Sequence, residues 1–157
     1  MANPEVRSRP FNSRGNRRAV SLCLIGFECD PERITFNCLA DLNIEVHKKG
    51  DLRGVNQSFD KNFVAFWTPA YALQAWDIYL EKIACELGGW DRLEKLITEI
   101  NPEDSWFRID VPIFGSPYVE SSVIDRATIR HMATIGLALE VGVREFDVNE
   151  PTHHPVP

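Results

Sequence analysis

Three ionisable side chains stand at alternate positions near the middle of the sequence. Glu45, His47 and Lys49 are two residues apart, and Asp51 follows in what reads as a turn. Residues two apart share one face of an extended strand, so the first three side chains are expected to project together. A carboxylate beside an imidazole can exchange protons with a substrate, which makes this group a candidate binding or acid/base site. The same alternation is also typical of a solvated strand edge, and no nucleophile accompanies it.

Two tryptophans and a long polar segment are the other candidate parts of such a site. The segment 49–61 holds two glycines and is expected to be a connecting loop that opens with a turn at Gly50. Loops of this length are often functional, so this one is a candidate rim of a binding cleft. Trp67 and Trp106 would then form aromatic walls, although tryptophan more often packs in the core.

No further motif for catalysis or cofactor binding is present in the sequence. It contains no Gly-rich phosphate loop, nucleophile elbow, HExxH pair or paired zinc knuckle. His153 and His154 stand among prolines, in a tail without the rigidity of a designed metal site. We therefore expect no catalytic residues, no metal and no cofactor.

The periodicity of the apolar residues predicts an α+β fold. Alternation indicates strands at 20–26, 44–47 and 137–143, and another strand is expected at 106–114. The segment 63–68 is apolar on both faces, which predicts an interior strand. Spacings of three and four, with capping residues, indicate helices at 31–39, 71–87, 90–100 and 121–135. The order β-α-β-β-α-α-β-α-β predicts one mixed sheet of about five strands with helices packed on it, and two βαβ-like halves. Pro112 predicts that its strand is an edge strand or carries a bulge.

Charge divides the chain into a basic start and an acidic remainder. The first 18 residues carry +4, which leaves −10 for the rest of a chain whose net charge is −6. We expect a flexible basic arm at 1–18, a single α+β domain at 19–147 and a frayed tail at 148–157. An acidic body repels phosphate backbones, so nucleic-acid binding is not expected, and it favours a basic protein partner.

The cysteines and the hydropathy of the sequence indicate where in the cell the protein is found. Cys23, Cys38 and Cys85 lie in apolar segments, which predicts buried and reduced thiols. No apolar run approaches the roughly 18 residues of a membrane span. The charged start has no apolar core of the kind found in a secretory signal. These features predict a cytoplasmic protein without a membrane span.

Several short motifs resemble a known bacterial family in their order and spacing. They are Asp30-Pro31-Glu32-Arg33-Ile34-Thr35, Lys49-Gly50-Asp51, Trp67 and Leu87-Gly88-Gly89-Trp90, followed by a helix, a small residue and a strand between 124 and 146. Over about residues 19–147 the chain resembles the family catalogued as domain of unknown function 4279. It departs from that family at 43–47, where a proline-threonine-like segment is usual. The resemblance implies a small bacterial α+β domain with no established activity, and it brings no catalytic residues.

Three hypotheses about function follow. The leading one is a non-enzymatic protein-binding module with an acidic body, for example an immunity-type protein that binds a cationic toxin. The second is a small-ligand-binding protein or an enzyme, with a cleft near the 49–61 loop. The third is a structural homo-oligomer in which the Pro112 strand or the strand at 137–143 pairs across a two-fold axis.

Overall fold

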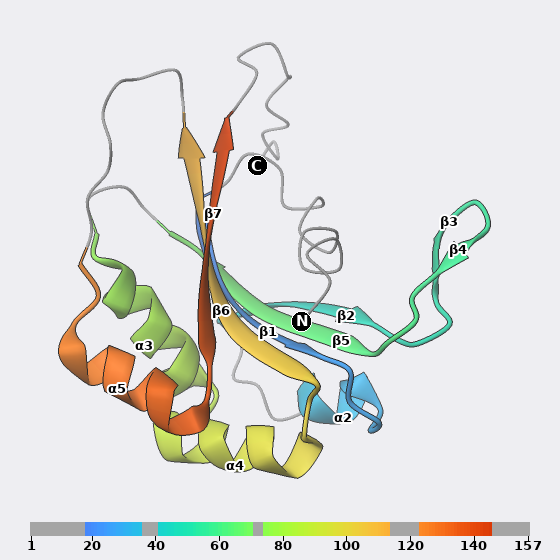
Figure 1. Cartoon of the computed structure of the whole chain (residues 1–157), viewed down its shortest axis with the longest axis horizontal. Coiled ribbons are helices and arrows are strands. Elements are labelled where there is room, and N and C mark those ends of the chain that lie inside the picture. The colour runs from blue at the N-terminus through green and yellow to red at the C-terminus, as the bar shows by residue number, and fades with distance from the viewer. Residues whose placement is uncertain (1–17, 36–40, 71–73, 114–122, 146–157) are drawn as a thin grey trace.

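A five-stranded mixed sheet organises the domain (Figure 1). The computed structural model describes residues 18–35, 41–70, 74–113 and 123–145. The strands of this sheet stand in the order β2-β5-β1-β6-β7. Their bounds are β1 Ala19–Ile25, β2 Asn43–His47, β5 Phe63–Pro69, β6 Asp104–Ile113 and β7 Ala138–Glu145.

The pairing of the strands confirms the predicted fold class. The central strand β1 is antiparallel to both β5 and β6, and β2 is antiparallel to β5. β6 and β7 are parallel, so the helix between them forms a βαβ crossover. β1 and β2 also run in the same direction, but β5 lies between them. The first predicted half is therefore a βαβ unit opened by an inserted strand.

Four helices pack on one face of the sheet. They are α2 Pro31–Thr35, α3 Trp76–Glu86, α4 Trp90–Ile100 and α5 Arg126–Ile135. Alternate residues of the strands meet them, because side chains two apart share a face. The core between the helices and the sheet includes Val20, Leu22, Leu24, Phe66, Leu80, Ile83, Leu93 and Phe107.

The helix ends follow the capping chemistry of the sequence. The backbone N–H of Glu32 donates to Asp30 Oδ1 at 3.0 Å, directly ahead of Pro31 in the first turn of α2. At the other end of α5, Gly136 takes the left-handed conformation with φ 75° and ends the helix as predicted. α3 begins at Trp76 instead of Tyr71, because Ala75 is extended. Residues 36–40, where the first helix was expected to continue, and 71–73 lie outside the described part of the chain.

The expected loop at 49–61 contains a small hairpin. β3 Leu52–Gly54 pairs with β4 Gln57–Ser58, and Asn56 adopts a positive φ of 67° in the turn between them. Figure 1 shows the hairpin standing away from the sheet and the helices. The sequence did not predict these strands because they are too short and too polar to show alternation.

The prediction that Pro112 marks an edge strand or a bulge was wrong for the strand as a whole. β6 lies between β1 and β7, and its register with each neighbour is continuous. The pairing with β1 stops at Asp110, however, whereas the pairing with β7 continues to Ile113. Pro112 therefore lies beyond the described pairing with β1, while it is still paired with β7.

The expected burial of the cysteines holds only in part. Cys23 is fully buried in β1, whereas Cys85 on α3 is exposed, so that expectation was wrong. The apolar residues around Cys85 in the sequence occupy the core face of α3, and Cys85 falls on the opposite face. Cys38 lies outside the described residues.

The proposed arm and tail also lie almost entirely outside the described residues. Arg18, the last residue of the expected arm, is buried, and its guanidinium lies 3.9 Å from the centre of the Trp76 ring. Within the described ranges, no helix has the length and hydropathy needed to cross a membrane.

A side-chain network joins α3, α4 and α5. Trp90 Nε1 donates to Glu81 Oε2 at 2.9 Å, and the Thr128 hydroxyl lies 2.9 Å from Glu81 Oε1. Asp125 caps α5 by accepting from the backbone N–H groups of Ala127 and Thr128. These bonds, above all the one from the backbone of Thr128, hold the pKa of Asp125 below its ordinary value.

We expect Asp125→Ala to lower the melting temperature at pH 7, because two N–H groups of α5 lose their acceptor. A carboxylate with a lowered pKa stabilises the fold above its ordinary pKa, and this contribution disappears as the pH falls through the lowered value. The gap in melting temperature between the two proteins should therefore close in acid. Calorimetry from pH 7 to pH 2 measures it, with Asp91→Ala in the first turn of α4 as control. A gap that is constant across this range would contradict the cap.

Candidate functional site

The face of the sheet opposite the helices gathers the polar and aromatic candidates. The register places Asn43, Trp67, Ser21, Arg108 and Glu140 in one row across the five strands. We call this side of the sheet the second face. Its central part is buried and includes Ser21, Cys23, Ala65, Phe63, Trp106, Arg108 and Asp110.

Glu45 and His47 form a close pair on β2. His47 Nε2 lies 2.8 Å from Glu45 Oε1, and because the carboxylate accepts, this nitrogen carries the proton. The imidazole stacks on the Phe59 ring with centroids 4.1 Å apart and planes 14° apart. The side chains of His47 and Glu45 are 26% and 15% exposed. The structure thus brings these two candidates together, and Phe59, which the sequence analysis missed, fixes the ring from the far side of the hairpin.

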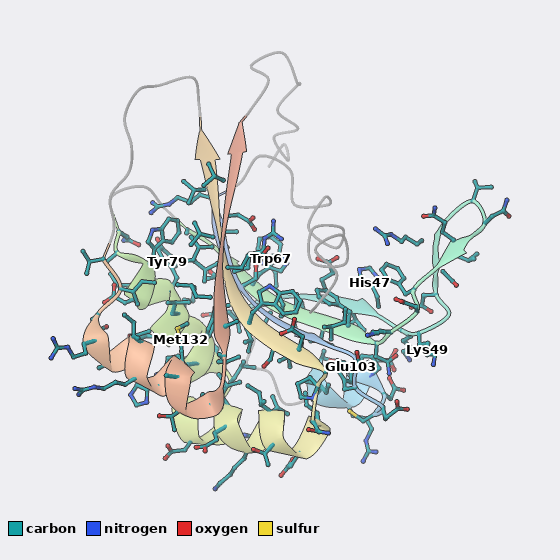
Figure 2. All side chains as sticks on the ribbon, in the orientation of Figure 1. His47, Lys49, Trp67, Tyr79, Glu103 and Met132 are labelled. Atoms are coloured by element: carbon teal, nitrogen blue, oxygen red, sulfur yellow. The ribbon has the colours of Figure 1, made fainter. Side chains whose placement is uncertain are left out.

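Lys49 and Asp51 do not join that pair. Asp51 Oδ2 accepts from the backbone N–H of Lys48 at 2.8 Å, which closes the turn at Gly50, where φ is 94°. The backbone N–H of Lys49 donates to Asn62 Oδ1 at 2.9 Å. Both side chains lie on exposed residues of the turn (Figure 2 labels Lys49). Their position in the turn, rather than in the strand, takes them off the face that Glu45 and His47 share.

Trp67 and Trp106 lie on the second face but away from the hairpin. Trp67 stands opposite Asn43, four residues along β2 from His47, which is about 13 Å at the rise of a strand. Trp106 is fully buried and is separated from Glu45 by β1 and β5. The two tryptophans thus share a face with the Glu45–His47 pair without contacting the hairpin that was expected to form the rim.

A buried charged group on the same face was missed by the sequence analysis. Arg108 Nε donates to Asp110 Oδ1 at 2.9 Å, and Arg108 Nη1 lies 3.7 Å from Glu140 Oε2. Gly142 leaves the room for it, since a Cβ there would lie 2.9 Å from Asp110 Oδ1 and 3.1 Å from Arg108 Nη2. The available signal was two opposite charges two residues apart in an otherwise apolar strand. Buried charges need such partners, so this group is one structural unit.

Ion pairs hold the base of the hairpin to the body. Lys48 Nζ lies 3.3 Å from Asp30 Oδ1 and 3.0 Å from Glu32 Oε1. Its contact with Glu32 is the main reason why the pKa of Lys48 is raised. On the other side of the hairpin base, between β4 and β5, Lys61 pairs with Glu103, and this pairing raises the pKa of Lys61. Carboxylates thus neutralise the cations where the hairpin leaves the sheet.

The tip of the hairpin carries exposed apolar side chains. Leu52 is 82% exposed and Val55 is 91% exposed. The hairpin is fixed at its base by the bonds from Gly50 N to Phe59 O and from Phe59 N to Asp51 O. Leu52 and Val55 therefore bury almost none of their surface within the chain, and the fold does not need their apolar character.

This arrangement supports two kinds of chemistry, binding of a partner and, more weakly, proton exchange. Among the described residues, no three His, Cys, Asp or Glu side chains gather in a way that could hold a metal ion. The Glu45–His47 pair can donate or accept a proton, and its stacking on Phe59 orients it. The hairpin tip offers an apolar contact.

Comparisons with protein-family models, with curated proteins and with solved structures find no match to this chain. The resemblance to domain of unknown function 4279 therefore stays a prediction.

We expect Gly142→Ala to destabilise the protein by about 1–3 kcal/mol, because the added methyl displaces the buried Arg108–Asp110 pair. Gly54→Ala is the matched control, since Gly54 is also in a strand and a Cβ there meets nothing within 4 Å. Urea unfolding of the three proteins measures the difference. Equal midpoints for the two variants would show that the ion pair does not depend on the space at Gly142.

Proposed function

We propose that this chain is a non-enzymatic protein-binding module that contacts its partner through the β3–β4 hairpin. The observation that carries the proposal is the exposure of Leu52 and Val55 at the tip of an element that stands off the body. Leu52 and Val55 are the two most exposed large apolar side chains of the described residues, and exposed apolar patches often mark protein contact sites. We also propose that the protein is bacterial and cytoplasmic. The resemblance to domain of unknown function 4279 supports the first point, and the free cysteines support the second.

The structure of the hairpin fits a role as a presented element. A short two-stranded hairpin is marginal on its own in water, so its conformation depends on what anchors it. Here the anchors are the Phe59–His47 stack, the Asn62 bonds and the ion pairs of Lys48 and Lys61. All of them lie at the base, which leaves the tip shaped in advance for a partner.

The charge of the body favours a basic partner. Residues 74–113 contain nine carboxylates against four Lys and Arg side chains. Asp91, Glu94 and Glu99 of α4 and Glu103 after it are exposed. A field of one sign raises the rate of encounter with a partner of the opposite sign and weakens with salt. The apolar tip would supply contact energy, and the acidic body would supply steering.

We expect the double variant Leu52→Ser with Val55→Ser to lose at least about tenfold in affinity for the natural partner, as for removal of an interface hot spot. The immobilised protein would first recover the partner from extract of its own host. The purified pair would then be measured by titration calorimetry at low and high salt.

The matched control is Ile78→Ser with Ile129→Ser, which removes two apolar side chains of about half exposure from the helices. It should bind like the unmodified protein. Retained affinity in the hairpin variant, with an unchanged melting temperature, would exclude the hairpin as the contact site.

The Glu45–His47 pair favours a second candidate function, a small-ligand site or an enzyme at this edge of the sheet. The pair is partly buried, held by a 2.8 Å contact and stacked against an aromatic ring. Such an oriented acid/base pair is what a ligand with a polar group would meet. It stands next to the base of the hairpin, as the expected rim of a cleft would require.

For this second candidate we expect the ring proton signals of His47 to shift when one ligand from a panel of small carboxylates, phosphates and amines is added at millimolar concentration. His47→Gln should then weaken binding by about tenfold, or about 1.4 kcal/mol. His131, stacked on Trp90 at 5.1 Å on the distant helix α5, is the internal control and should not move. A panel that leaves both histidines unmoved would remove this candidate.

A further inference from the structure

The edge strand β7 exposes an apolar stripe that the fold does not use. Leu139, Val141 and Val143 are large hydrophobics that the structure leaves exposed, the two valines at 57% each. By register they stand opposite Phe107, Ile109 and Val111 of β6, so they lie on the helix side of the sheet. Figure 1 shows that β6 and β7 extend beyond the helices, which explains why nothing described covers this stripe.

The two edges of the sheet differ in how they are protected. β2 has five residues, carries the Glu45–His47 pair and leads directly into two lysines. Charges and short length are the ordinary means by which an edge strand avoids pairing with another chain. β7 has eight residues, ALEVGVRE, with no proline and no lysine, and no described strand pairs with its outer side. β7 also carries charged residues, but its greater length and its apolar stripe make it the edge of the sheet better suited to accept a strand.

We propose that β7 pairs antiparallel with β7 of a second copy of this chain, about a two-fold axis at Gly142. The result is a dimer with one continuous ten-stranded sheet. This inference is independent of the hairpin and of the function proposed for it. A two-fold axis makes the two contact surfaces identical, as closed dimers require.

The sequence of β7 is self-complementary in this register. With Gly142 opposite Gly142, Val141 of each copy faces Val143 of the other, which joins the two apolar stripes on one face. On the second face, Glu140 of each copy stands opposite position 144, an arginine in the sequence. The Glu140 side chain is 28% exposed, so it is open to a second cation beside Arg108.

Other centres for the axis lose part of this match. With the axis at Val141, Glu140 would face Gly142 and its charge would have no opposite neighbour on the second copy. The axis at Gly142 keeps the valine pairs and places Glu140 of each copy opposite a position of opposite charge in the sequence. In this register residues 139–145 of the two strands face one another and would form about six to eight main-chain hydrogen bonds, within the range of ordinary interfaces.

The first experiment measures mass in solution by sedimentation over a range of protein concentration. We expect twice the 17.9 kDa of the chain at about 100 µM. Val141→Lys should raise the dissociation constant at least tenfold, because it places a charge in the valine contact. The control is the same valine-to-lysine change at the exposed hairpin tip, Val55→Lys, which should leave the dimer intact. A monomer for the unmodified protein at this concentration would overturn the proposal, and equal dissociation by Val55→Lys would move the interface to the hairpin.

The second experiment tests the register by disulfide trapping, in a background with the four native cysteines replaced by alanine. Facing residues have Cβ atoms about 4.5–5.5 Å apart, whereas diagonal ones are about 7–8 Å apart and bridge poorly. A mixture of Val141→Cys and Val143→Cys chains should therefore cross-link under mild oxidation, and each variant alone should not. Efficient cross-linking of Val141→Cys with itself would overturn the axis at Gly142.

Discussion

Burial of β1 on both sides is the constraint on which the rest of the structure depends. All seven residues of β1 are buried, and it pairs with β5 on one side and β6 on the other over its whole length. On the helix side it supplies Val20, Leu22 and Leu24 to the core. On the second face it presents three small residues, Ala19, Ser21 and Cys23, followed by Ile25 at its end. Large residues of the neighbouring strands stand beside two of the small ones. Trp67 and Arg108 flank Ser21, and Trp106 stands beside Cys23. A larger side chain at Ser21 or Cys23 would have to displace an aromatic ring or a buried ion pair.

The sequence predicted the positions of the strands and helices better than it predicted which strands lie side by side in the sheet. Alternation, and at 63–68 a run that is apolar on both faces, located the strands of the sheet, because in a half-buried or buried strand the pattern of side chains is set locally. The apolar run at 63–68 correctly predicted an interior strand. Strand order, however, depends on contacts between distant segments, and nothing local states that the neighbours of β5 are β1 and β2. Pro112 shows the same limit. It was expected at an edge or a bulge, but it lies in an inner strand, beyond the described end of the pairing between β6 and β1.

In the candidate site, too, contacts within one strand were predictable, and contacts between distant segments were not. The Glu45–His47 contact was predictable, since two residues of one strand need only the period of the backbone to meet. Phe59 was not, because it reaches His47 only through a hairpin whose strands are too short to leave a pattern. Arg108 and Asp110 did leave a signal, two charges at alternate positions of an apolar strand. Their meaning depended on Glu140 and Gly142 from the neighbouring strand, which the parallel pairing of β6 and β7 brings opposite them.

The order of the strands also separates the two surfaces that this chain offers. The hairpin leaves the sheet from the β2–β5 end, and the apolar stripe lies on β7 at the other edge, with β1 and β6 between. Binding at one surface therefore need not obstruct the other. Pairing through β7 would place the two hairpins of a dimer at opposite ends of a ten-stranded sheet. A partner with two copies of the matching site would then bind the second hairpin at a raised effective concentration, provided its own spacing matched that of the sheet. In this arrangement the dimer interface sets the distance between the two apolar tips, because the hairpins are anchored to the sheet at their bases.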